Sequence, residues 1–267
     1  MKKSLLNIAM ALVLGVISTF TYGQKSTITS SFAVEVNKNT PTISFQTPDL
    51  EKIKSEDAEN DAKGMRYRIG VGTETMITPN NAGLWTTLAN GDRVWQLKIS
   101  YPGAEALSFL FSKFILNGRS TMDVLSLSGE KLHKTYGSAD VLDHGQQNMS
   151  LCYADEVVLQ LVEPVGTQAS ILEVDEVYFC YRGTGNPNVA KINESDDCEV
   201  NVNCSPEGNN WQDEKQSVAR ILVVDGGQFW CSGALVNNVN QNDKPYFLTA
   251  LHCGVTATTA NFNQWRF

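Results

Sequence analysis

One histidine stands beside a cysteine in a pattern that could support proton-transfer chemistry. His252 is followed directly by Cys253, and Cys231 lies upstream of both. An imidazole titrates near neutral pH, so a histidine held close to a hydroxyl can act as its general base. A bridge between the two cysteines could hold the backbone at this histidine. The alternative is a core or metal-binding histidine, but no second histidine or carboxylate stands at ligand spacing, so no metal is expected.

Short apolar runs would position these residues. Phe229 to Val236 and Tyr246 to Ala250 have the composition of β-strands and are separated by a polar loop. Upstream, Ile221 to Val224 is followed by Asp225-Gly226, a pair typical of a tight hairpin turn because its glycine accepts positive φ. We therefore expect three strands, with the histidine at the end of the third.

The residues around the histidine resemble the histidine box of trypsin-like serine proteases. Cys-Ser-Gly-Ala-Leu-Val starts at Cys231, and Pro-Tyr-Phe-Leu-Thr-Ala-Leu-His-Cys-Gly ends at Gly254, which is typical of the bacterial lysyl endopeptidase-like branch. The resemblance implies that His252 is the general base of a catalytic triad. It also implies that Cys231 and Cys253 form a disulfide, and that residues 198–267 begin a chymotrypsin-like β-barrel.

Residues 65–182 have the pattern of an antiparallel β-sandwich, because short apolar runs alternate with Gly, Pro and Asn turn signals. The predicted strands are Arg66–Val71, Arg93–Tyr101, Leu107–Leu116, Thr121–Leu127, Glu156–Val162 and Val177–Tyr181. The side chains expected in the core are Trp85, Trp95, Phe109, Phe111 and Phe114. A short, solvated helix is expected from Asp49 to Ala62, within a leader that spans residues 24–64.

Residues 65–182 also resemble part of the lysyl endopeptidase-like family. Gly83-Leu84-Trp85-Thr86-Thr87-Leu88 and the run from Asn90 to Trp95 are similar to the N-terminal pro-region of lysyl endopeptidase-like precursors, which is removed on maturation and assists folding. The expected fold class is therefore all-β, with an antiparallel β-sandwich pro-region followed by the start of an incomplete chymotrypsin-like β-barrel.

The first 23 residues read as a secretory signal peptide. Met1-Lys2-Lys3 precedes an apolar run from Leu5 to Ile17, which is too short to cross a bilayer of about 30 Å. We expect a secreted monomer without a membrane partner once this peptide is removed. The net charge of −8 and the absence of any Lys/Arg cluster after the first residues argue against a nucleic-acid partner. No cofactor is expected.

Six cysteines in an exported chain are expected to be mostly bonded. Whether Cys152 and Cys180 bond to each other is left open by the sequence. In the family that the chain resembles, Cys198 and Cys204 would pair with cysteines further downstream, and a bond between these two is the alternative here.

Residues 183–197 are rich in Gly, Asn, Ser and Asp and read as a linker. Precursors that the chain resembles are cut shortly before their first mature cysteine, which predicts processing between Lys191 and Ile192. Alternatively, any trypsin-like enzyme could cut an exposed linker at Arg182 or Lys191.

The resemblance implies the precursor of a secreted serine endopeptidase that acts on polypeptides after basic residues, with lysine favoured. The 267 residues contain no Gly-Asp-Ser-Gly motif and no matching aspartate, so the chain reads as an N-terminal fragment that is inactive as it stands. A fourth strand is expected at Asn263–Phe267, with an unpaired edge near Trp265. The alternative is a non-catalytic, secreted β-sandwich binding or adhesion protein with a vestigial protease segment.

Overall fold

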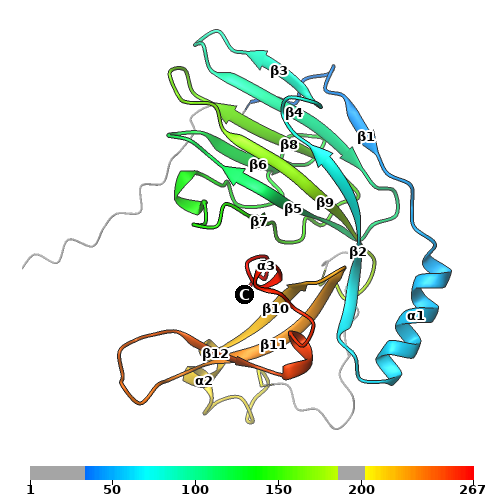
Figure 1. Ribbon diagram of the computed structural model, residues 1–267, viewed down its shortest axis with the longest axis vertical. Coiled ribbons are helices and arrows are strands. Elements are labelled where there is room, and N and C mark those ends of the chain that lie inside the picture. The colour runs from blue at the N-terminus through cyan, green and yellow to red at the C-terminus, as the bar shows by residue number, and fades with distance from the viewer. Residues whose placement is uncertain (1–33, 186–201) are drawn as a thin grey trace, which may run out of the picture. The chain divides into compact units, whose positions relative to one another are not determined.

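The chain has an all-β fold, as the sequence predicts. A computed structural model describes residues 34–185 and 202–267, which form two β-sheets and a few short helices (Figure 1). The first sheet has the order β1 (Thr42–Ser44), β4 (Arg93–Ser100), β8 (Glu156–Glu163) and β6 (Thr121–Leu125), with β3 (Leu84–Thr87) on β4. The second has the order β10 (Val218–Val224), β11 (Gln228–Val236), β2 (Tyr67–Ile77), β9 (Ile171–Cys180), β5 (Ala106–Ile115) and β7 (Gln147–Asn148), with β12 (Tyr246–Thr249) on β11.

The helical elements are short. They are α1 (Leu50–Ala62), α2 (Gln212–Ser217), α3 (Thr259–Phe262), and the 3₁₀ turns η1 (Ser138–Asp140) and η2 (Leu251–Cys253). None of the helices in residues 34–185 and 202–267 has the length and apolar character needed to span a bilayer.

The two sheets enclose one core of large side chains. Trp95 on β4 and Phe109, Phe111 and Phe114 on β5 are at most 1% exposed, and they belong to one buried cluster with residues of β6, β8 and β9. Phe109 and Phe111 share a face because side chains alternate along a strand, and the register shift between Phe111 and Lys113 brings Phe114 to the same face. The predicted core is confirmed at these four positions, whereas Trp85 packs half-buried at its margin.

The six strands predicted between residues 65 and 182 correspond to β2, β4, β5, β6, β8 and β9. Two are longer than predicted by several residues, because β2 continues to Ile77 and β9 starts at Ile171, and β8 extends by one residue to Glu163. In the extension of β2 and β9, Glu74 pairs with Glu176. Backbone hydrogen bonds therefore continue the strands over polar residues, which an apolar pattern cannot predict. The short strands β1, β3 and β7 were not predicted.

The predicted helix is present, but it is not simply solvated. Asp49 caps α1 by accepting a hydrogen bond from the Lys52 amide, and Asp57 is only 2% exposed. The Asp57 carboxylate accepts hydrogen bonds from Arg68 Nε at 2.8 Å and from Tyr181 Oη at 2.7 Å. These contacts fasten α1 to β2 and to the end of β9.

Arg182 does not lie in an exposed linker, so that part of the expectation is wrong. Its Nη1 and Nη2 atoms donate to the two Asp61 carboxylate oxygens at 2.6 and 3.1 Å, and its Nε atom lies 3.2 Å from Asp57 Oδ2. Its guanidinium also stacks on the Tyr67 ring, 4.1 Å from the centroid. The acidic face of α1 therefore covers this arginine.

Some predictions fall on residues outside the described part of the chain. These are the signal peptide, the processing pair Lys191 and Ile192, and Cys198. Among the described cysteines, Cys152 and Cys180 are buried free thiols, and Cys204 is an exposed one. Burial raises the pKa of Cys152 to about 12, and it also raises the pKa of Cys180.

The C-terminal strands continue the second sheet of the sandwich. Gln228, Phe229 and Trp230 on β11 pair antiparallel with Gly70, Arg68 and Tyr67 on β2, respectively. As predicted, β10 and β11 form a hairpin whose turn has positive φ at Gly226, at 65°. Within the described residues these strands do not close into a barrel.

The last five residues do not form the expected fourth strand. Thr258 caps α3 through a reciprocal pair of hydrogen bonds with Asn261, and this turn directs Trp265 inward, where it is 7% exposed. Beyond it, Arg266 forms an isolated backbone bridge with Leu222 on β10, and its Nε atom donates to the Asn148 carbonyl at 2.5 Å. The expectation of an unpaired edge near Trp265 is therefore wrong, because the side chain is packed and its neighbour is paired.

The contact between α1 and Arg182 predicts protection from proteolysis. Trypsin should leave the bond after Arg182 intact in the wild type, because its P1 side chain is bound to Asp57 and Asp61. Asp57→Asn removes a buried charge partner, so it should lower the free energy of unfolding by about 3 kcal/mol and make this bond a cleavage site. Limited digestion with mass spectrometry of the new N-termini measures the effect.

Glu59→Gln is the matched control, since Glu59 lies on the same helix with its side chain 72% exposed. This variant should keep the wild-type pattern. Rapid cleavage after Arg182 in the wild type would contradict the bound conformation.

Candidate active site

The end of β12 carries His252. Thr249, the last residue of this strand, pairs with Gly233 on β11, and the chain then makes one tight turn in which the Cys253 amide donates to the Ala250 carbonyl at 3.0 Å. This turn, η2, leaves the His252 side chain exposed and the Cys253 side chain 2% exposed. Neighbouring residues thus point in opposite directions, one toward solvent and one into the packed interior.

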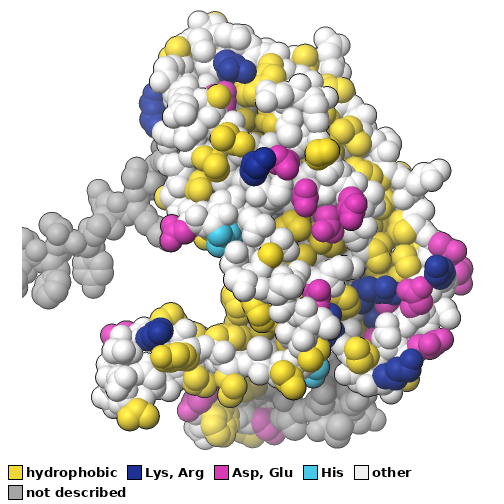
Figure 2. Space-filling model, in the orientation of Figure 1, with side chains coloured by type: hydrophobic (Ala, Val, Ile, Leu, Met, Phe, Trp, Pro, Cys, Tyr) yellow, Lys and Arg dark blue, Asp and Glu magenta, His cyan; other side chains and the backbone are white. Residues whose placement is uncertain are grey.

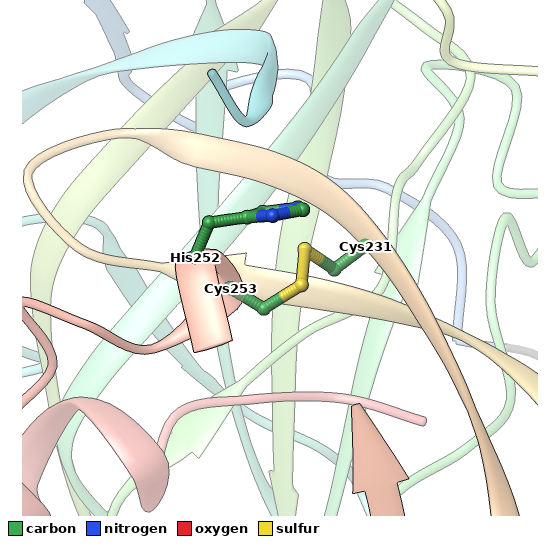
Figure 3. Close-up of side chains that lie close together, drawn as sticks. All are labelled: Cys231, His252 and Cys253. Atoms are coloured by element: carbon green, nitrogen blue, oxygen red, sulfur yellow. A yellow bond between two sulfur atoms is a disulfide. The ribbon is translucent and has the colours of Figure 1, made fainter. Parts of the chain in front are cut away.

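A disulfide joins this turn to the neighbouring strand. Cys253 is bonded to Cys231 on β11, with an S–S distance of 2.07 Å and a sequence separation of 22. Figure 3 shows the His252 ring beside this bridge. Cys253 packs in a small cluster with Ile221 and Trp265, so the residue after the histidine is held by both covalent and apolar contacts.

The three side chains at this point do not make a metal centre. A ligand atom of Cys231, His252 and Cys253 each lies within 4.8 Å of the other two. Both sulfurs are committed to the disulfide, however, and metal binding by cysteine requires the thiolate. The imidazole is then the one group of the three with free donor or acceptor capacity, and one protein ligand is fewer than a metal site uses.

An arginine that precedes β2 holds the other side of the turn. Arg66 Nη1 donates to the Cys253 carbonyl at 3.4 Å, and Arg66 Nη2 lies 2.9 Å from Asp225 Oδ2. Asp225, in the β10–β11 turn, also accepts a hydrogen bond from the Thr256 hydroxyl. That bond, followed by the Arg66 guanidinium, holds the pKa of the Asp225 carboxyl below its ordinary value.

Sequence reasoning placed Arg66 at the start of a strand and Asp225 in a turn, and it gave neither a role at the histidine. The two residues are 159 positions apart, so no local pattern connects them. Within residues 34–185 and 202–267, the structure gives the His252 ring no hydrogen-bond partner. An orienting carboxylate or a nucleophilic hydroxyl is thus not supplied by these residues.

A shallow apolar groove lies beside the histidine-bearing strand. It is lined by Val218, Ser232, Gly233, Ala234, Leu248, Thr249 and Ala250. Leu248 and Val218 are 66% and 60% exposed, and Figure 2 shows hydrophobic side chains on the surface of the region that β11 and β12 form. A stripe of this kind on a sheet is typical of a surface that contacts further polypeptide.

Comparisons with known proteins relate this region to a class of peptidases. Residues 192–267 match the family model of the lysyl endopeptidase C-terminal domain. The lysyl endopeptidase of Pseudomonas aeruginosa is 22% identical over 237 residues, which cover 82% of this chain and 50% of that protein. The chain therefore spans about half the length of the curated relative it matches. These similarities support a relationship to lysyl endopeptidases and extend it to the sandwich region.

Loss of the Cys231–Cys253 disulfide should destabilise the C-terminal strands. Replacing both cysteines with serine releases a short loop from its cross-link, which should lower the free energy of unfolding by about 3 kcal/mol. Chemical denaturation under oxidising conditions measures the difference. Cys204→Ser is the control, because Cys204 is an exposed free thiol and its replacement should change little.

The lowered pKa of Asp225 predicts a stability effect that depends on pH. A carboxyl whose folded pKa lies below its unfolded value contributes stability above the unfolded value, near pH 4, and loses it as the pH falls through the folded pKa. Asp225→Asn should therefore lower stability by about 1 to 2 kcal/mol at pH 6.

The difference between wild type and Asp225→Asn should shrink toward zero near pH 2, as measured by denaturant unfolding at a series of pH values. Asp140 and Glu173 also have lowered pKa values, so the comparison between the two proteins isolates Asp225. A difference that is constant with pH would show that the carboxylate charge is not involved.

Proposed function

We propose that this chain supplies the general base of a secreted serine endopeptidase of the lysyl endopeptidase type. The observation that carries the proposal is the exposed His252 imidazole at a strand end, whose neighbour Cys253 is tied to Cys231 by a disulfide. A general base must stay about 3 Å from the hydroxyl that it deprotonates, so its backbone has to be held. The match of residues 192–267 to the family model supports the same role.

In this proposal His252 takes the proton of a serine hydroxyl as that oxygen attacks the carbonyl carbon of a polypeptide substrate. It then returns the proton to the leaving amine. The 267 residues contain no Gly-Asp-Ser-Gly motif, and in this proposal the orienting aspartate and the nucleophilic serine are supplied by polypeptide outside them. The preferred cleavage site follows a basic residue, with lysine favoured by the similarity to lysyl endopeptidases.

Residues 1–23 direct export in this proposal, and residues 65–182 are a pro-region. Processing between Lys191 and Ile192 separates that region from the protease segment, and the enzyme acts as a monomer. N-terminal sequencing of the secreted product tests this point. A mature chain that starts elsewhere than Ile192 would rule out the site.

One observation favours a second candidate function. The strands that carry the disulfide continue the second sheet of the sandwich, and Gln228 of β11 is fully buried against it. A non-catalytic, secreted β-sandwich binding protein with a vestigial protease segment accounts for such a joint sheet without further catalytic groups.

The locus distinguishes the two functions. The reading frame past the Phe267 codon is expected to continue into a Gly-Asp-Ser-Gly motif. The full-length product is expected to cleave lysine esters, and a serine-directed inhibitor is expected to stop this cleavage. His252→Ala should then reduce kcat on the order of a millionfold, because the triad acts as a unit. His144→Ala, a change at an exposed histidine, is the control and should retain activity. A stop codon in an intact locus would favour the binding protein.

A further inference from the structure

Arg66 occupies a position that connects three separate segments. It directly precedes β2, where Tyr67 and Arg68 pair with Trp230 and Phe229 on β11. From there its side chain reaches the Asp225 carboxylate in the β10–β11 turn and the carbonyl of Cys253 at the end of η2. The guanidinium also lies over the Phe229 ring, 4.5 Å from the centroid.

The burial and shape of this group make the arrangement specific. The Arg66 side chain is 13% exposed and that of Asp225 is 20% exposed, so water screens their interaction less than it would on an open surface. The planar guanidinium presents several N–H donors in a fixed geometry, which lets Nη1 and Nη2 bind two acceptors at once. A lysine ammonium at this position could hold the carboxylate but would not match both acceptors in the same way.

The Cys253 carbonyl belongs to the residue that follows His252. The Cys253 side chain is fixed by the disulfide to Cys231, and the Cys253 carbonyl accepts a hydrogen bond from Arg66. Two anchors on one residue restrict rotation of the backbone on the C-terminal side of the histidine. The direction of the imidazole follows from that backbone, because the ring itself has no partner among the described residues.

We infer that Arg66 is a positioning residue, which orients the His252 side chain by binding the Cys253 carbonyl and Asp225 together. In the proposed function this orientation belongs to the precursor, because processing between Lys191 and Ile192 would separate Arg66 from His252. The orientation itself does not rest on that function. The N-terminal region of the chain thus contributes one of the two anchors of the candidate general base.

Histidine nuclear magnetic resonance of the full chain tests the inference. The chain has three histidines, so the ring signals of His133 and His144 are internal references in every variant. In Arg66→Ala the His252 ring signals should shift and broaden, while those of the other two histidines stay in place. Arg66→Lys should give a smaller change, because the ion pair to Asp225 is retained.

Arg93→Ala is the matched control. Arg93 also combines a stacked ring, Trp85 at 4.1 Å, with a carboxylate, Glu163 at 3.7 Å, but it has no contact with the histidine turn. It should leave the His252 signals unchanged. Asp225→Asn weakens the same anchor while keeping a side chain of equal size, so it serves if Arg66→Ala does not fold.

Unchanged His252 signals in Arg66→Ala, or equal changes at all three histidines, would overturn the inference. In the second case the arginine would only support overall stability, which a thermal unfolding curve would register. The readout needs neither substrate nor nucleophile. A failure of the proposed protease function would therefore appear in the activity assay and leave this measurement intact.

Discussion

The pairing of β2 with β11 is the constraint on which the position of His252 depends. β2 is held in the sandwich by β9, and its first residues in turn hold β11, which carries Cys231. The junction is sealed by a buried side chain, since Gln228 Nε2 donates to Ser108 Oγ at 2.8 Å and Gln228 Oε1 accepts from Cys180 Sγ at 3.4 Å. Leaving the buried Gln228 side-chain amide without these partners would cost about 1 to 3 kcal/mol of folding free energy. The hydrogen bonds therefore favour this register of β11 on β2.

The sandwich stabilises the strands around His252, because β2 and β11 belong to one sheet. Residues 202–267 belong to the same compact unit as the sandwich, and a segment of that length buries too little apolar surface to be robust alone. Without β2, strand β11 would pair only with β10 and β12 along much of its length and would expose an edge near Trp230. A sandwich that supplies this pairing stabilises the strands that bear the candidate general base.

The turn at His252 separates two physical requirements. Cys253 is buried and bonded, which gives rigidity, whereas the imidazole one residue earlier is exposed to solvent, as the proposed general base has to be. A tight turn directly after a strand satisfies both, because successive residues there point in different directions. The apolar groove along β11 and β12 lies on the same few strands, so rigidity, access and a contact surface come from one short segment.

The sequence by itself determined nine of the twelve described strands in outline, four of the five predicted aromatic core residues, the hairpin turn at Asp225-Gly226 and the adjacency of His252 and Cys253. These features are local, since alternation along a strand and glycine in a turn act over a few residues. Only the tertiary structure decided that α1 buries Asp57, that Arg66 meets Asp225 across 159 positions, and that Trp265 turns inward from a helical cap instead of extending a strand. Those outcomes depend on which distant surfaces pack together, and the geometry of packing leaves no periodic trace in the chain.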